Sequence, residues 1–180
     1  MKVLAFDIGI KNLAYCLMDG TSICAWEILD ISGKDFKEVS KILITELHDR
    51  FPDAEWDAVL IENQPVIQNP TMKSIQILIY SYFMILVHQS GSNCDVKLVA
   101  PMMKLKVSQN ENPKLKLSYK ERKVFSVDIT KKYLANDSKW LPMFLSCKKK
   151  DDLGDAFLYN VNYLEYKGFK FASDALTACD

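Results

Sequence analysis

The stretch that most constrains the fold is Lys2–Leu17, in which two short apolar runs flank a glycine turn. The first run, Val3–Phe6, is continuously apolar, which is typical of a strand buried on both faces of a sheet. It ends in Asp7, and a carboxylate there is costly to bury unless it is paired or binds a cation. The stretch therefore predicts an acidic group that faces a cleft at the end of a sheet. The simpler alternative is an aspartate that caps a hairpin turn.

Turn signals and hydrophobic periodicity predict the other elements. We expect five strands, over residues 2–7, 12–18, 22–29, 57–62 and 95–100. We expect helices over 35–51, 70–89, 119–135 and 151–166, a basic loop over 102–118 and irregular structure over 136–146. The first three strands are joined by tight turns and must be antiparallel, whereas the last two arrive through helices and should run parallel to their neighbours. The prediction is an α/β fold in which a five-stranded mixed sheet has helices on both faces.

The composition suits a single domain over residues 1–180. With 49% hydrophobic residues, the chain can build one sizeable core, whereas two domains would be cramped. The five cysteines form no CxxC pair and there are two histidines, so neither a disulfide framework nor a zinc site is indicated. Reduced cysteines, and a first strand that begins at residue 2, favour a cytoplasmic protein that is not secreted. The most apolar run, Ile75–Val87, is shorter than the roughly 20 residues that span a bilayer, so no membrane partner is expected.

The charges are unevenly distributed although the net charge is zero. Residues 97–150 contain 14 Lys and Arg but 4 Asp and Glu, and the remainder of the chain is correspondingly acidic. A basic segment of this kind could bind the phosphate backbone of a nucleic acid. The commoner alternative is a pair of solvated faces that bind no partner.

The fourth predicted strand also ends in a carboxylate, that of Glu62. If this strand is adjacent and parallel to the first, Asp7 and Glu62 share the sheet edge at which open α/β sheets bind ligands. Asp152 and Asp155 are three residues apart, so they lie on one face of the last helix. Carboxylates are also favoured in any first helical turn, which is the simpler explanation for this pair.

Four carboxylates in one pocket repel one another unless cations neutralise them. They are hard oxygen ligands, which suit Mg²⁺ or Mn²⁺, and a pair of such ions is a known solution for hydrolysis of a phosphodiester. Gly154 and Ala156 are small, and we expect them to let the last helix pack close against the sheet.

Three segments resemble the motifs of RuvC-type Holliday junction resolvases, namely FDIGIKNLAYC at 6–16, IENQP at 61–65 and KKDDLGDAF at 149–157. The resemblance is greatest to the poxvirus branch, followed by the yeast mitochondrial resolvases, and extends from residue 2 to about 166. It implies a ribonuclease-H-like fold. It also implies a homodimer that resolves four-way and other branched DNA by paired symmetric nicks. Such an enzyme uses Mg²⁺ or Mn²⁺, with two ions in each active site, and no small-molecule cofactor.

The same resemblance implies roles for particular residues. The catalytic residues and metal ligands that it implies are Asp7, Glu62, Asp152 and Asp155. Asp151 is an additional acid beside the family pattern, so the register of the closing pair stays open by one residue. A poxvirus relative would act in the host cytoplasm, at sites of viral replication, where it would resolve concatemers of viral DNA.

Basic and polar residues near these motifs are candidates for contacts with DNA. The candidates are Lys11, Asn69, Lys73, Lys104, Lys106, Lys114, Lys116, Lys148, Lys149 and Lys150. The apolar helix around Ile75–Val87 is the candidate for a dimer interface, because a two-fold junction suits a two-fold protein. A central core helix is an equally good explanation of the same pattern.

Three rival functions share some of these features. Another ribonuclease-H-like nuclease, acting on RNA or an RNA–DNA hybrid, would carry similar acids. An actin-like ATPase also opens with Asp-x-Gly, but it needs two such domains and a glycine-rich nucleotide loop that this chain lacks. A DNA-binding module on an inactive nuclease fold would not be expected to keep all four acids.

Overall fold

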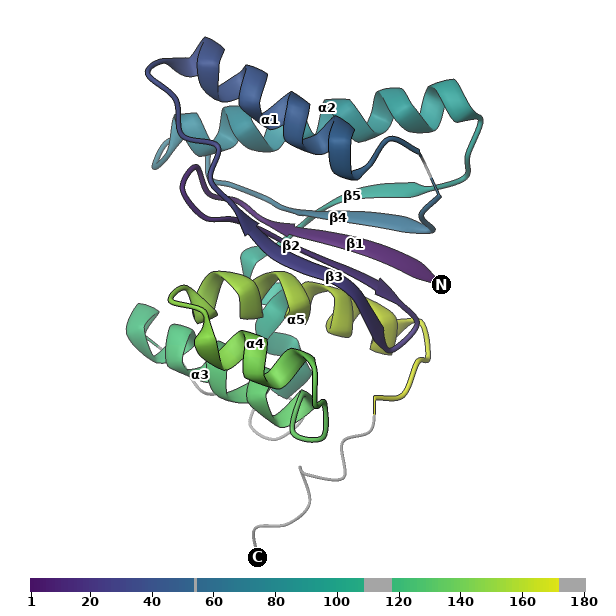
Figure 1. The fold of residues 1–180 in the computed structure, drawn as a ribbon, viewed down its shortest axis with the longest axis vertical. Coiled ribbons are helices and arrows are strands. Elements are labelled where there is room, and N and C mark those ends of the chain that lie inside the picture. The colour runs from purple at the N-terminus through teal and green to yellow at the C-terminus, as the bar shows by residue number, and fades with distance from the viewer. Residues whose placement is uncertain (54, 109–117, 172–180) are drawn as a thin grey trace, which may run out of the picture.

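A five-stranded sheet forms the middle layer of the chain (Figure 1). The computed structural model describes residues 1–53, 55–108 and 118–171. The strands are β1 (Lys2–Asp7), β2 (Leu13–Asp19), β3 (Ser22–Leu29), β4 (Ala58–Glu62) and β5 (Asp95–Val99). Their spatial order is β3-β2-β1-β4-β5, with β1 to β3 antiparallel and with β4 and β5 parallel to β1. The predicted mixed sheet is therefore confirmed.

Helices cover both faces of this sheet (Figure 1). The helical elements are α1 (Phe36–Arg50), α2 (Pro70–Ser90), the 3₁₀ helix η1 (Pro101–Ser108), α3 (Tyr119–Tyr133), α4 (Trp140–Ser146) and α5 (Lys150–Tyr166). Helices α1 and α2 lie on one face, and α5 lies on the other, with α3 and α4 packed outside it.

Two predictions about irregular segments are wrong in part. Residues 102–108, the first part of the expected basic loop, belong to η1, and residues 109–117 lie outside the described part of the chain. Residues 140–146 form α4 rather than irregular structure. Pro142 did not prevent this helix, because a proline within the first turn lacks only an N–H that has no intrahelical partner there.

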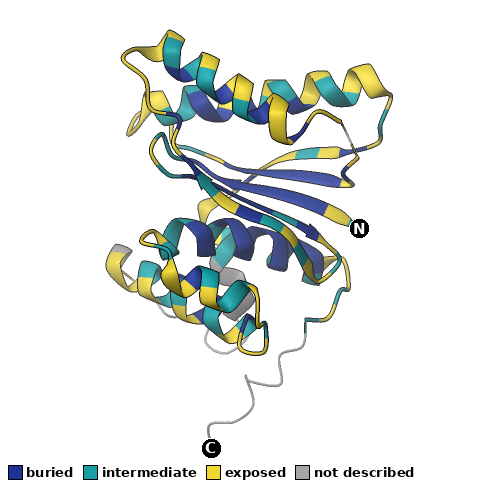
Figure 2. Cartoon of the chain, viewed as in Figure 1, coloured by how far each residue is buried: buried dark blue, intermediate teal, exposed yellow. Residues whose placement is uncertain are grey.

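Strand β1 is buried along nearly its whole length (Figure 2), and its alternate side chains belong to two separate cores. Leu4 and Phe6 pack under α1 and α2, in a cluster that is rich in aromatic rings. Val3 and Ala5 point the other way, into a cluster with α5. All four side chains are fully buried. Because both faces of β1 are covered, its terminal carboxylate, that of Asp7, is held at a rigid position.

Helix α5 contacts both the sheet and α3. The indole nitrogen of Trp26, in β3, donates a 2.9 Å hydrogen bond to the carbonyl of Leu153. A Cβ on Gly154 would lie 2.9 Å from the Oγ1 atom of Thr130, in α3. Gly154 therefore allows α5 to approach α3 rather than the sheet. The expectation that α5 packs against the sheet is confirmed, and Ala156 is fully buried in the core that α5 shares with β1.

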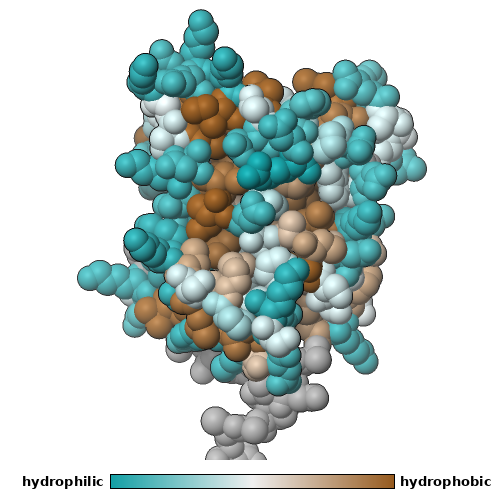
Figure 3. All heavy atoms as spheres, in the orientation of Figure 1, coloured by the Kyte–Doolittle hydropathy of each residue, from teal (hydrophilic) through white to brown (hydrophobic). Residues whose placement is uncertain are grey.

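Helix α2 is both a core helix and a partly exposed apolar one. Ile75, Ile79 and Phe83 are fully buried against the sheet, whereas Ile77 and Ile85 are about half exposed, at 51% and 56%. With 21 residues and a mean hydropathy of 1.2, it is the one described helix long and apolar enough to cross a membrane. The sequence analysis took the apolar run Ile75–Val87 as too short to span a bilayer, but the helix that contains it is long enough. On the face seen in Figure 3, apolar side chains reach the surface in separate patches among hydrophilic ones.

Candidate active site

The parallel pairing of β1 and β4 brings two carboxylates to the same sheet edge. Phe6 pairs with Ile61, so the next residues, Asp7 and Glu62, follow at the carboxyl ends of neighbouring strands. Both are buried, with 7% and 8% of their surface exposed. The side-chain amide of Gln64 donates a 2.5 Å hydrogen bond to the Oε2 atom of Glu62, which fixes the carboxylate at the strand end.

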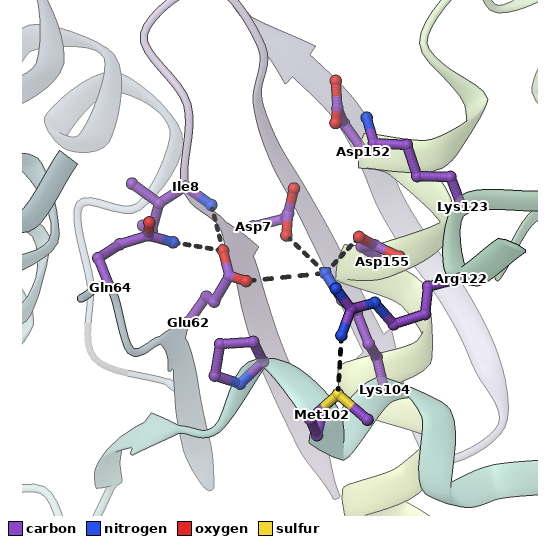
Figure 4. A pocket seen from close by; sticks show the side chains of 11 residues that line it. Asp7, Ile8, Glu62, Gln64, Met102, Lys104, Arg122, Lys123, Asp152 and Asp155 are labelled. Atoms are coloured by element: carbon purple, nitrogen blue, oxygen red, sulfur yellow. Dashed lines mark hydrogen bonds and ion pairs between the residues drawn. The ribbon is translucent and has the colours of Figure 1, made fainter. Parts of the chain in front are cut away.

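A third carboxylate, that of Asp155, reaches this edge from α5 (Figure 4). The hydroxyl of Ser126, in α3, donates a hydrogen bond to its Oδ1 atom. Gly154 precedes Asp155 and permits the close approach of α3 that brings Ser126 within reach. The carboxylate is therefore positioned by two helices.

The ammonium of Lys104, in η1, lies among the three carboxylates (Figure 4). Its Nζ atom is 3.4 Å from Asp7 Oδ1 and 3.7 Å from Glu62 Oε1, and it makes an ion pair with Asp155 Oδ2. It also lies 5.4 Å from the ring centroid of Tyr159. The sequence predicts Lys104 as a DNA contact, whereas the structure places it inside the acidic cluster.

The two neighbouring acids at the start of α5 differ in their surroundings. Asp152 lines the same pocket as Asp7, Glu62 and Asp155, but in Figure 4 it lies apart from the other three. Asp151 does not line that pocket and makes an ion pair with Lys123, which does. Of the two neighbouring acids, Asp152 is the one that lines the pocket together with Asp155.

The electrostatics of the pocket show an excess of buried negative charge. Burial raises the pKa of Asp7 well above its ordinary value; Lys104 offsets part of this increase, and Glu62 and Asp155 add to it. Burial likewise raises the pKa of Asp155, against the opposing effects of Lys104 and Ser126. Burial and the neighbouring Asp151 carboxylate raise the pKa of Asp152 to about 6. The cluster therefore favours additional positive charge.

The pocket has a volume of about 340 Å³ and includes residues that the sequence analysis did not identify. These residues are Ile8, Gln64, Pro101, Met102, Arg122 and Lys123. A periodic signal existed for Arg122 and for Ser126, which holds Asp155, because the two are four residues apart on one face of a predicted helix. Without knowing that this face meets α5, however, the sequence could not place them in a site.

The donor set fits divalent cations, although a preformed metal site is not found. Within the described ranges, no group of three or more His, Cys, Asp or Glu side chains is arranged to hold a metal ion. The Lys104 ammonium stands in the position of a cation, bound to three of the four predicted ligands. Carboxylate oxygens are the ligands that Mg²⁺ and Mn²⁺ prefer, so the chemistry of the residues suits those ions.

Residues 1–167 match the family model described as Poxvirus A22 protein. The chain belongs to this family. The predicted resemblance to the poxvirus branch of the resolvases is thereby confirmed. A relative from Acanthamoeba polyphaga mimivirus, an uncharacterized protein, is 38% identical over 125 residues. That alignment covers 61% of this chain and 29% of the relative, so the chain spans under a third of that relative's length.

Solved structures share the fold at low sequence identity. The fowlpox virus resolvase, in complex with Holliday junction DNA, is 23% identical, with 93% of this chain and 99% of that chain covered and a TM-score of 0.63. The yeast mitochondrial Holliday junction resolvase Ydc2 is 16% identical, with 92% and 80% covered and a TM-score of 0.66. RuvC from Thermus thermophilus is 16% identical, with 94% and 98% covered and a TM-score of 0.56. The predicted ribonuclease-H-like α/β fold of this member of the A22 family is thus confirmed.

Several predicted DNA contacts have structural partners of their own. Lys73 donates hydrogen bonds to Asn63 Oδ1 at 3.0 Å and to Gln76 Oε1 at 3.1 Å. The same Gln76 oxygen accepts a 2.7 Å hydrogen bond from the backbone of Gln64, which in turn holds Glu62. Asn69 caps α2 by accepting a hydrogen bond from the backbone of Met72 at 3.2 Å. The start of α2 is therefore connected to the loop that follows Glu62.

The remaining predicted DNA contacts lie on the surface or outside the described residues. Lys11, Lys148 and Lys149 are exposed, and Lys150 is half-buried with its ammonium donating to the carbonyl of Cys147. Lys114 and Lys116 lie outside the described residues, as does the side chain of Lys106. An open groove of about 410 Å³, here called the lysine groove, is lined by Lys123, Val124, Val127, Asp128, Lys131, Lys148, Lys150 and Asp151.

Proposed function

We propose that this chain is a structure-specific endonuclease that resolves four-way DNA junctions. The observation that carries the proposal is the convergence of three carboxylates, two buried and one partly buried, from β1, β4 and α5, on a single cation position. Such a concentration of buried acids is costly unless it binds cations, and phosphodiester hydrolysis is a reaction that carboxylate-bound cations support. Membership of the poxvirus A22 protein family supports the same conclusion.

The substrate follows from the relatives with the same fold. The fowlpox virus resolvase and Thermus thermophilus RuvC were both solved in complex with Holliday junctions. In this chain, the lysine groove lies next to the carboxylate pocket, since Lys123 lines both. A basic surface beside an acidic pocket suits a DNA backbone that passes the site of hydrolysis.

The proposed metal ligands are Asp7, Glu62, Asp152 and Asp155, which would hold two Mg²⁺ or Mn²⁺ ions. When bound, such a pair of ions activates a water molecule and stabilises the leaving 3′-oxygen. The chain's own residues position the ligands: Gln64 holds Glu62, and Ser126 holds Asp155. Lys123 and Arg122 also line the pocket, where they can attract the phosphate that enters it.

The proposed assembly is a homodimer of a single domain over residues 1–180, acting in the host cytoplasm on viral DNA. Two sites related by a two-fold axis would make paired symmetric nicks in a two-fold junction. Helix α2 is the proposed interface, because Ile77, Met84 and Ile85 are exposed on it. Replacing Ile85 with Lys should then give a monomer in light scattering, whereas a matched change on α3, Val124→Lys, should not.

The decisive experiment compares end-labelled substrates in the presence of Mg²⁺ or EDTA. The substrates are a four-way junction, a Y-shaped duplex, a linear duplex and an RNA–DNA hybrid. We expect Mg²⁺-dependent cleavage of the four-way junction at two symmetric positions and no cleavage of the linear duplex. Preferential cleavage of the hybrid would instead support another ribonuclease-H-like nuclease, and junction binding without cleavage by any divalent ion would support a non-catalytic module.

A further inference from the structure

Lys104 has an unusual environment for a lysine. Only 16% of its side chain is exposed, and the three carboxylates around it are similarly buried, with 9% of Asp7, 11% of Glu62 and 15% of Asp155 exposed. Lysine is rarely buried unless it is paired, and here one ammonium faces three acids. The three acids therefore compensate the charge of the lysine, but its single positive charge does not neutralise all three carboxylates.

The ammonium compensates the acids in a way that no other described contact does. Gln64 and Ser126 each donate a hydrogen bond to one carboxylate, but neither side chain carries charge. Lys104 contacts oxygens of all three acids from one point. Removing one partner of a buried ion pair leaves an uncompensated charge, which strongly destabilises a protein. In the protein without metal, Lys104 thus stabilises the folded state by compensating the charge of the acidic cluster.

A divalent cation and this ammonium cannot both occupy the centre of the cluster. Mg²⁺ binds carboxylate oxygens at about 2.1 Å, so an ion held by the same acids would lie near the present position of the Nζ atom. Like charges at such a separation repel strongly in a buried site. Binding of the metal therefore requires the ammonium to move.

We propose that Lys104 is a resident counter-cation, which neutralises the carboxylate cluster in the metal-free protein and is displaced from it when a divalent ion binds. The inference rests on the proposed function in taking the cluster as the metal site. It predicts that the lysine competes with the metal, so that the metal-free protein is kept folded at the expense of metal affinity. Displacement also links metal binding to the position of η1, which carries Lys104.

The first test measures binding of Mn²⁺ by calorimetry to the full chain without DNA. Lys104→Gln removes the competing charge, and we expect it to bind Mn²⁺ roughly tenfold to a hundredfold more tightly than the wild type. Lys104→Arg keeps a charge there and should stay close to wild type. Lys97→Gln, which breaks the exposed pair with Asp95, is the matched control and should change affinity less than twofold.

Thermal unfolding of the same proteins gives a second prediction. Without metal, Lys104→Gln should lower the melting temperature, and saturating Mn²⁺ should raise it by more than it raises that of the wild type. Equal or weaker Mn²⁺ binding by a folded Lys104→Gln protein would overturn the proposed competition.

A test on the wild-type chain covers the case in which Lys104→Gln does not fold. An amine-reactive reagent is applied with and without saturating Mn²⁺, and modification of Lys104 and Lys97 is quantified by peptide mass spectrometry. We expect modification of Lys104 to rise severalfold when the metal binds, while that of Lys97 stays constant. Continued protection of Lys104 in the metal-bound protein would contradict the inference.

The outcomes separate this inference from the proposed function. If the wild type binds Mn²⁺ but a folded Lys104→Gln protein binds it no more tightly, or Lys104 stays protected from labelling, the counter-cation is rejected and the nuclease proposal stands. If the wild type binds no divalent ion with or without junction DNA, the metal site itself is rejected, and the inference fails with it.

Discussion

The carboxylate pocket and the lysine groove contain the same two kinds of charged group in opposite proportions. In the pocket, four acids outnumber three basic side chains, and the ammonium of Lys104 lies among the acids. In the groove, four lysines face two acids, Asp128 and Asp151, on an open surface. Lys123 lines both regions. The two regions thus adjoin but should attract partners of opposite charge.

Burial explains why breaking an ion pair costs less free energy in the lysine groove than in the carboxylate pocket. An exposed pair such as Lys131 with Asp128 contributes about 0–1 kcal/mol, so its lysine can exchange the acid for a phosphate at little cost. A buried pair is costly to break unless another charge takes the place of the lost one. The groove is therefore suited to reversible binding of DNA, and the pocket is suited to binding cations tightly.

The largest effect is expected from the buried acids of the pocket. Asp7→Asn and Asp155→Asn each remove a proposed metal ligand without changing side-chain size. Because a bound metal contributes several kcal/mol to the transition state, we expect the rate of junction cleavage to fall about a thousandfold or more. Affinity for the junction, measured by gel shift without metal, should change less than about threefold. Comparable turnover by Asp7→Asn in Mg²⁺ would remove the distinction between pocket and groove.

A smaller effect should separate the adjacent acids at the boundary between the two regions. Asp152→Asn alters the pocket, and we expect single-turnover cleavage to fall about a hundredfold. Asp151→Asn alters only the pair with Lys123 in the groove, so cleavage at saturating protein should stay within about threefold. Equal losses of cleavage rate in the two variants would show that Asp151 and Asp152 do not differ in their contribution to the pocket.

The groove should control binding rather than chemistry. The double change Lys131→Gln with Lys148→Gln removes two proposed phosphate contacts, so the slope of log affinity against log salt should become less steep by roughly two. Cleavage at saturating protein should be retained. Lys41→Gln, an exposed lysine on α1 across the sheet, is the control. An unchanged slope in the double variant would mean that DNA follows another surface.

The smallest effect concerns the stability of the metal-free protein at different pH. The pKa of Asp152 is raised to about 6, above its ordinary value of 3.8, so the folded state holds this proton more tightly than the unfolded state does. The stability from this group is fully present below about pH 4 and is lost as the pH rises through 6. The free energy of unfolding of Asp152→Asn should therefore exceed that of the wild type by about 1 kcal/mol at pH 7, a value reduced to allow for partial exposure. Near pH 4 the two proteins should be equally stable.

Urea denaturation in EDTA at the two pH values measures this difference. Asp151→Asn is the matched control, because burial raises the pKa of Asp151 but Lys123 lowers it further, to below the ordinary value. The change in the free energy of unfolding that Asp151→Asn causes should have the opposite sign, with the variant less stable than the wild type at pH 7. A stabilising effect of both changes would indicate general charge repulsion rather than a property of the pocket.

The acids were predictable because their signals are local. An apolar run that ends in a carboxylate identifies both the strand and the position of the acid, as at Asp7 and Glu62. The parallel pairing of these strands followed from the helices between them. The role of Gly154 was harder, since a small residue on a helix permits close packing but does not say against which neighbour.

The position of Lys104 could not be predicted from its sequence neighbourhood. It lies in a segment rich in lysine, where an exposed, phosphate-binding side chain is the ordinary expectation. Which lysine turns inward depends on η1 lying beside α5 and on three acids distant in sequence. The short helix α4 was missed for a simpler reason, because seven residues that include Pro142 give little periodicity.

The hydrogen bond from Trp26 to the carbonyl of Leu153 gives the protein a natural optical reporter. Leu153 lies between Asp152 and Asp155 in α5, and the indole also stacks on Phe144 with ring centroids 5.2 Å apart. The emission of an indole depends on the polarity and hydrogen bonding around it. A shift of this turn of α5 upon ion or DNA binding would therefore change the intrinsic fluorescence of Trp26, and Trp56→Phe with Trp140→Phe would isolate that signal in real time.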